Sequence, residues 1–262
     1  VRDVGIYIFN EHDKLKLSKK ITEMLQEVFA EVVNVADQAG EDADALADIA
    51  EQRIAAEKKS AKQEAKWARE ITFEVEIGAL FKEKFFISPS GIQWKGTTTT
   101  LDSITRVRYG GTSHSVNGIP TGTDFIIAYG TNSNMTTIHI RKGKTYQAIL
   151  ARLWKAVSTK ILLDILNRLK AGEKITFGDA VVTDYGVNIR RKKIFASGDF
   201  EQCKWSELQM WTADGCLHIG KKNDKKLVAS LAYQDCDNVH ILEFVLRHKF
   251  QKPGATLSGS FE

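Results

Sequence analysis

The spacing of apolar residues changes along the chain, and at the beginning it is helical. Ser18 stands at an N-cap position, and the apolar residues near it predict a helix with one buried face: Ile21, Leu25, Val28, Phe29, Val32 and Val35. The segment 37–40 indicates a break, because Gly40 suits the left-handed position that ends many helices. A short strand is expected before this helix, at 5–9.

A second helix is predicted from Asp42 to Arg69, where Ala, Glu and Lys are abundant. Its apolar stripe is thin, since Leu46, Ile49 and Ile54 are followed mostly by alanines. We therefore expect this helix to form a helical hairpin with the first helix, or to pack against another chain. Its charges have mixed signs and are expected to face solvent.

The period becomes two residues at Ile71, where apolar and polar positions start to alternate. Strands and turns are expected from there on, with one long helix among them. The apolar positions of that helix run from Tyr146 to Leu169, and Gly172 ends it. Ser158-Thr159 is a place where it could bend or split.

Two parts of this β-rich region repeat each other. The segments 86–95 and 181–190 both contain two apolar residues, a turn that ends in Gly, and a second strand that ends in a basic residue. Further on, 101–104 parallels 205–208, with two apolar residues around a polar pair. More strands and a closing helix follow in each copy. The shared order favours two copies of one fold over a single larger α+β sheet domain.

This order resembles the pleckstrin-homology-like (PH-like) fold, which includes bacterial PH and GRAM domains. The block 203–208 resembles the strand-entry pattern of those domains. The resemblance implies an α+β fold with an N-terminal helical hairpin and two small antiparallel β-barrel or sandwich units, each closed by a C-terminal helix. The expected domains are a helical region, two PH-like domains and a flexible tail, at 1–70, 71–172, 173–252 and 253–262.

Composition narrows the function classes only slightly. The 262 residues carry a net charge of +4, which by itself does not indicate a nucleic-acid binder. The three cysteines lack metal or redox spacing, and reduced thiols in a cytosolic protein are expected. No apolar run approaches the ~20 residues that span a bilayer, so no transmembrane segment is expected. The chain begins with Val1, which leaves open whether residues precede it.

No familiar catalytic or cofactor motif is present. Gly143-Lys144-Thr145 resembles the end of a phosphate-binding loop, but Ile138 stands where that loop needs Gly. His240 and Glu243 are spaced as a helical pair, without the further ligands that a metal needs. We therefore expect no enzyme activity, cofactor or metal. The lack of a motif does not exclude an enzyme, because catalytic groups also assemble in space.

Two regions are candidate binding surfaces. The segment 110–122 is predicted to be a loop longer than a hairpin needs, and His114 and Asn117 are its candidate residues, together with Lys95 at a hairpin of the first copy. The alternative for this loop is a mobile segment without function. The second region consists of two basic turns in the second copy: Arg190, Arg191, Lys192, Lys193, Lys221, Lys222, Lys225 and Lys226.

The PH-like resemblance implies that such basic turns can hold a phosphorylated lipid headgroup. We expect the two turns to lie near each other and to bind an anionic headgroup or an acidic protein. The alternative is that these lysines and arginines are solvated and only keep the protein soluble.

Together these observations predict a non-catalytic adaptor that binds a protein partner or an anionic membrane headgroup. Its location would be cytoplasmic, or peripheral at the membrane, and its N-terminal helices would join a partner or a homo-oligomer. Nucleic acid is not favoured, because Trp94, Trp205 and Trp211 fall at strand positions where core packing is expected. The alternative is an accessory region of an enzyme or defence system whose catalytic part lies elsewhere.

Overall fold

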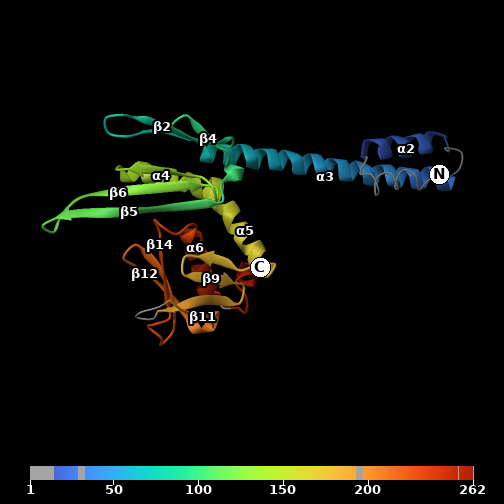
Figure 1. The fold of residues 1–262 in the computed structure, drawn as a ribbon. Coiled ribbons are helices and arrows are strands. Elements are labelled where there is room, and N and C mark those ends of the chain that lie inside the picture. The colour runs from blue at the N-terminus through green and yellow to red at the C-terminus, as the bar shows by residue number, and fades with distance from the viewer. Residues whose placement is uncertain (1–14, 29–32, 193–196, 253, 262) are drawn as a thin grey trace. The chain divides into compact units, whose positions relative to one another are not determined.

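The structure is a computed structural model that describes residues 15–28, 33–192, 197–252 and 254–261 (Figure 1). Its contacts divide the chain into two compact units, 1–69 and 70–262. The strand expected at 5–9, and the apolar residues Phe29 and Val32, lie outside the described residues.

The first unit contains α2 (Leu15–Val28) and most of α3 (Val33–Ile71). The prediction that Gly40 ends a helix is wrong, because α3 continues through this residue. One interior Gly costs a helix only about 1 kcal/mol, and the many Ala and charged residues around it favour the helix. Ser18 is not an N-cap either, since α2 begins three residues earlier. The expected helical hairpin stays a prediction.

The second unit begins with a segment that we call the first repeat, 73–170. Four antiparallel strands pair in sequence order, β1 (Phe73–Ile77), β2 (Glu83–Ser88), β3 (Gly91–Trp94) and β4 (Thr97–Thr99). After the 3-10 turn η1 (Leu101–Ser103), a second antiparallel sheet contains β5 (Arg106–Val116), β6 (Ile119–Gly130) and β7 (Met135–Ile140). The closing helix consists of α4 (Gly143–Leu153), the π-helical turn η2 (Trp154–Ser158) and α5 (Thr159–Lys170).

The second repeat, 175–251, has the same order of elements. Its first sheet contains β8 (Ile175–Phe177), β9 (Ala180–Thr183), β10 (Gly186–Lys192) and β11 (Ser197–Lys204). The 3-10 turn η3 (Trp205–Glu207) precedes a second sheet of β12 (Leu208–Ala213), β13 (Cys216–Lys221) and β14 (Val228–Ala232). Helix α6 (Val239–Gln251) comes next. The segments that match in sequence therefore form matching elements.

In each repeat, one position requires glycine for the same structural reason. Gly91 and Gly186 both begin the second strand of the matching hairpins. A Cβ at Gly91 would lie 2.5 Å from the carbonyl oxygen of Thr99, and one at Gly186 would lie 2.0 Å from that of Cys203. Only Gly lets the neighbouring backbone come this close.

The expected barrels are not present, because the described strands form four separate sheets and none is closed. In the first repeat, α4 contacts β1 of one sheet and β6 and β7 of the other, and Figure 1 shows it between them. Tyr146 of α4 stacks on Phe125 of β6, with ring centroids 4.4 Å apart, and Arg152 lies over the ring of Phe73 in β1. The helix thus separates the two sheets that a barrel would join.

The long helix follows the sequence prediction closely. The π-helical turn η2 ends at Ser158, where a bend or split was expected. Gly172 has a φ of +85°, and its N–H donates to the carbonyl of Leu169, so the prediction that this glycine ends the helix is confirmed.

The predicted long loop at 110–122 is wrong. This segment forms the outer part of the β5–β6 hairpin, which Figure 1 shows as a long projection. Its turn consists of Asn117 and Gly118, whose φ values are +51° and +81°. Positive φ at both central residues is typical of the tight turn that Asn-Gly favours in hairpins.

The prediction of a flexible tail at 253–262 is also wrong, because the described residues of this segment are folded. Leu257, Ser258 and Ser260 are buried, and the segment ends in the 3-10 helix η4 (Ser258–Phe261). Asp184 accepts hydrogen bonds from the backbone N–H and the hydroxyl of Ser258, at 2.7 and 2.9 Å. The buried ammonium of Lys249 donates to two carbonyls of the same segment.

Polar contacts join the two repeats along the outer edge of β5. Asn238 donates its backbone N–H to the carbonyl of Val107 and accepts the N–H of Val107 at 2.9 Å with its side chain. Asp237 pairs with Arg106 and Arg108. Part of the edge of β5 is therefore satisfied by residues just before α6.

Candidate functional site

The structure brings the two basic segments of the second repeat together. Arg190 and Arg191 belong to β10 rather than to a turn, and Lys221 ends β13. The remaining lysines Lys222, Lys225 and Lys226 lie in the connection between β13 and β14, while the side chain of Lys192 and the whole of Lys193 lie outside the described parts.

Acidic side chains occupy the space between these segments. Arg191 contacts Glu201 at 2.6 Å and Asp224 at 3.0 Å, and Lys221 contacts Glu201 at 2.8 Å. Hydrogen bonds from Lys221 and Arg191 lower the pKa of Glu201, and the carboxylates raise the pKa of both cations. Two of the eight candidate cations are thus neutralised within the fold.

The other described cations have separate environments. The guanidinium of Arg190 lies 4.7 Å from the ring centroid of Phe200, and Lys222 donates to the carbonyl of Ser206 at 2.8 Å. Lys225 and Lys226 are exposed. The proximity of the two segments agrees with the sequence hypothesis, but the pairing of Arg191 and Lys221 with carboxylates leaves less of their charge available to an anion than the sequence indicated.

A second surface, which no sequence pattern had indicated, lies at one end of the first repeat. Leu80 and Phe81 in the β1–β2 turn are 91% and 86% exposed. The turn is tight at Gly78, whose φ is +131° and where a Cβ would lie 2.0 Å from the carbonyl oxygen of Phe81. The available signal was two bulky apolar residues inside a turn, where polar residues are usual.

A pocket of about 590 Å³ adjoins this turn. Its walls come from the β1–β2 turn, β6, the end of β7 and the start of α4: Glu76, Ile77, Gly78, Ala79, Asp124, His139, Ile140, Arg141, Lys142 and Thr145. Asp124 lies 3.5 Å from Arg141 and accepts a hydrogen bond from Nε2 of His114 at 3.1 Å. The candidate His114 is therefore connected to the wall of this pocket through Asp124.

The other two candidates of the first repeat also lie at turns. Lys95 is in the β3–β4 turn, at the same end of the first sheet as the β1–β2 turn, because the strands alternate in direction. Its ammonium lies 5.8 Å from the ring centroid of Trp94. Asn117 is at the tip of the β5–β6 hairpin, where Val116 and Ile119 are 60% and 68% exposed.

We call the β1–β2 turn, the β3–β4 turn and this pocket the apolar-tipped end of the first repeat. Lys82 and Lys84 pair with Glu76 and Glu74, and Glu83 leaves the β1–β2 hairpin with one net negative charge. Lys95 and Lys142 of this end, and Lys144 beside the pocket-lining Thr145, have no ion pair within the described part of the chain. The end therefore combines exposed apolar side chains with an excess of positive charge.

Buried titratable groups lie elsewhere, where the two repeats meet. The ring of His240 is stacked between Tyr109 and Tyr233, with centroid distances of 3.8 and 4.2 Å. Burial lowers the pKa of His240, and its Nε2 contacts the carbonyl of Tyr109 at 2.7 Å. A neutral imidazole that donates to this carbonyl fits the geometry. His240 of the second repeat is thus hydrogen-bonded to Tyr109 of the first.

Few features of the described residues favour metal binding, nucleic-acid binding or membrane spanning. Among them no group of three or more His, Cys, Asp and Glu side chains could hold a metal ion. Trp94 and Trp205 are buried, and Trp211 is 39% exposed and stacks on His218. No helix in the described ranges is both long enough and apolar enough to cross a bilayer. Comparison with family models, curated proteins and solved structures finds no match.

Proposed function

We propose that this chain is a non-catalytic adaptor with two PH-like domains, and that the first of them docks on an anionic membrane surface. The PH-like part of the proposal is supported by the element order, which is a four-stranded sheet, a 3-10 turn, a three-stranded sheet and a helix, twice. On this proposal each domain is an open variant of the PH-like fold, because its two sheets are separate.

The observation that carries the membrane proposal is the exposure of Leu80 and Phe81. Burying a side chain of this size is worth roughly 1.5–3 kcal/mol, so leaving two adjacent ones in water is unfavourable. A monomer tolerates single exposed apolar residues, but two at the tip of a tight turn can enter a bilayer together.

Electrostatics favours an anionic surface over a neutral one. Each Lys or Arg near such a surface contributes about 1 kcal/mol. Lys95 and Lys142 of the apolar-tipped end, and Lys144 beside it, would therefore add to the insertion of the two apolar residues. The basic segments of the second repeat support this role less well, because Glu201 and Asp224 already neutralise part of their charge.

Vesicle sedimentation tests the proposal. We expect the full chain to sediment with vesicles that contain phosphatidylserine and much less with pure phosphatidylcholine vesicles. The variant L80E/F81E should lose this binding. The matched control is L163E/Y185E, which replaces two other exposed apolar residues with the same charge.

The result that would overturn the proposal is equal sedimentation of L80E/F81E and the control, or no sedimentation of the wild type with anionic vesicles. In either case the exposed turn would have to serve a protein partner instead. Circular dichroism of both variants ensures that the comparison is made between folded proteins.

A further inference from the structure

Charged residues of α3 form one continuous face whose sign changes at its midpoint. The acidic part consists of Glu41, Asp44, Asp48 and Glu51, and the basic part consists of Lys59, Lys62, Lys66 and Arg69. Steps of three and four residues keep all of them, and Ala55 in the middle, within about 40° of one line along the helix. All nine side chains are exposed. We call this set the α3 charge face.

Three charged residues that would interrupt this pattern lie on the other side of the helix, and Glu70, which follows its basic end, pairs with Lys155. At 100° per residue, Arg53, Glu57 and Glu64 fall opposite Ala55. Leu46 also falls opposite Ala55 and is only 4% exposed, so the covered side of α3 is the side away from the charge face. The charge face is thus separate from the surface by which α3 packs in its own unit.

This arrangement is unfavourable in an isolated helix. Within the charge face every charged neighbour at three or four positions has the same sign, as in the pairs Asp44 and Asp48, or Lys62 and Lys66. Like charges at this spacing destabilise a helix, whereas acidic and basic residues alternate along stable single helices. The pattern is therefore one that a charged partner of the opposite order would stabilise.

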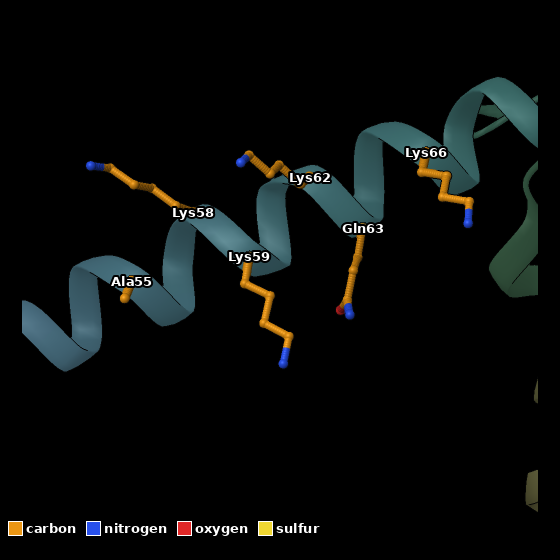
Figure 2. A pocket seen from close by; sticks show the side chains of 6 residues that line it. All are labelled: Ala55, Lys58, Lys59, Lys62, Gln63 and Lys66. Atoms are coloured by element: carbon orange, nitrogen blue, oxygen red, sulfur yellow. The ribbon is translucent and has the colours of Figure 1, made fainter.

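Figure 2 shows the basic half of this face from close by. Lys58 and Lys62 extend to one side of the helix there, and Lys59, Gln63 and Lys66 extend to the other. Together with Ala55, these residues line a shallow hollow on α3. A helix laid along this hollow would meet positive charge from Lys59 to Lys66 and a small residue at Ala55.

We propose that α3 pairs antiparallel with α3 of a second copy of this chain through the charge face. The acidic and basic residues are placed symmetrically about Ala55, at four, seven, eleven and fourteen positions on either side. A two-fold axis at Ala55 therefore sets each acid of one copy opposite a base of the other: Glu51 with Lys59, Asp48 with Lys62, Asp44 with Lys66, and Glu41 with Arg69. Each pair occurs twice, as a self-complementary interface requires.

The charges also determine the direction of pairing. A parallel pair in register would set acid against acid and base against base over the whole face, which is repulsive. The small side chain of Ala55 allows the two helices to approach at the axis. Because exposed ion pairs are individually weak and are screened by salt, we expect a dimer that is only about micromolar in strength and depends on ionic strength.

Sedimentation velocity of the full chain tests the proposal. We expect a monomer–dimer equilibrium whose dissociation constant rises at least about tenfold between about 50 mM and about 500 mM NaCl. Two reversal variants should be monomeric: D44K/D48K/E51K, which leaves Glu41 as the one acidic residue of the face, and K59E/K62E/K66E, which leaves Arg69 as its one basic residue. The matched control E57K/E64K reverses charges on the opposite side and should dimerise like the wild type.

Mixing the two reversal variants gives the decisive result. Their faces are complementary, so the mixture should form a one-to-one heterodimer although neither variant forms a homodimer. A wild type that stays monomeric at about 100 µM in low salt would overturn the proposal, and so would dimers that survive in both reversal variants. Failure of the mixture to associate, with both variants still helical by circular dichroism, would also overturn it. None of these outcomes depends on vesicle binding.

Discussion

Asp184 shows how one buried carboxylate fixes the C-terminal segment at the scale of a residue. Its two oxygens accept the N–H and the hydroxyl of Ser258. Asp184→Ala leaves both donors without an acceptor, and we expect it to lower the free energy of unfolding by about 1–3 kcal/mol, measured by urea denaturation. The exposed Asp179→Ala is the control, with little expected change. An equal loss in the two variants would mean that the carboxylate does not hold the segment.

Glu201 gives a prediction about pH. Its pKa is lowered in the folded state by Lys221 and Arg191, so its contribution to stability is present at neutral pH and is lost as the pH falls through that pKa. We expect Glu201→Gln to lower the melting temperature at pH 7, and the difference from the wild type to shrink below about pH 4.

The control for this experiment is Glu83→Gln, because Glu83 has no ion pair within the described residues. Its melting temperature should follow the wild type at every pH. A Glu201→Gln effect that is as large in acid as at neutral pH would show that the carboxylate's charge is not what stabilises the network.

The ion pairs of Glu201 and Asp224 illustrate which part of the site could be predicted from the sequence and which part could not. The runs of Lys and Arg are visible in the sequence, and their proximity followed from the expected hairpins. Their neutralisation did not, because Glu201 and Asp224 reach Arg191 from other strands and turns, at sequence separations that no local pattern reports. Leu80 and Phe81 were missed for a similar reason, since exposure depends on how the turn at Gly78 is built.

At the scale of the element, two glycines with the same sequence signal have opposite roles. Gly40 lies inside α3, whereas Gly172 comes after α5 with a φ of +85°. We expect Gly40→Ala to raise the free energy of unfolding by about 1 kcal/mol, because Ala is the better helix former. Gly172→Ala should lower it by about 1–2 kcal/mol, because a Cβ is unfavourable in the left-handed region. Urea denaturation followed by circular dichroism measures both.

A stability loss in Gly40→Ala would indicate that this residue is left-handed after all and that α3 is divided there. The sequence could not decide between the two glycines. Whether a helix ends at a glycine depends on the residues beyond it. Those after Gly40 are as helix-favouring as those before it, while a strand begins soon after Gly172.

The outer part of the β5–β6 hairpin was predicted to be a loop, and that prediction failed for a different physical reason. Alternation of apolar and polar residues reports a strand with one buried face. The outer part of β5, from Gly111 to Val116, is exposed throughout, so it has no buried face to report. Asn117-Gly118 was the remaining signal, since this pair favours a hairpin turn with positive φ.

At the scale of the whole molecule, the sequence predicted the order of the elements well and their packing poorly. Two copies of the hairpin and of the blocks 101–104 and 205–208 could be recognised in the sequence, because each depends on local chemistry, such as Gly91 and Gly186 against a neighbouring strand. The open sheets were not predicted, because the position of α4 between them depends on contacts such as Phe125 with Tyr146. The contacts along the edge of β5 between the repeats could not be predicted from the sequence either.

That edge carries the last prediction. The N–H of Val107 donates to the side chain of Asn238, and Asp237 holds Arg106 and Arg108 beside it. D237A/N238G removes these side chains, and Gly keeps the left-handed φ of +60° at position 238. We expect the Val107 amide to exchange at least about tenfold faster with solvent, and the two repeats to unfold as separate transitions in calorimetry.

Asp235→Ala is the matched control, because Arg108 contacts only the backbone carbonyl of Asp235, which Ala retains. Its exchange and its calorimetric profile should match the wild type. If D237A/N238G also behaved like the wild type, the stacked rings of Tyr109, His240 and Tyr233 would be sufficient to join the repeats. Since burial already keeps the pKa of His240 low, such a joint would weaken only at pH values acidic enough to protonate that ring.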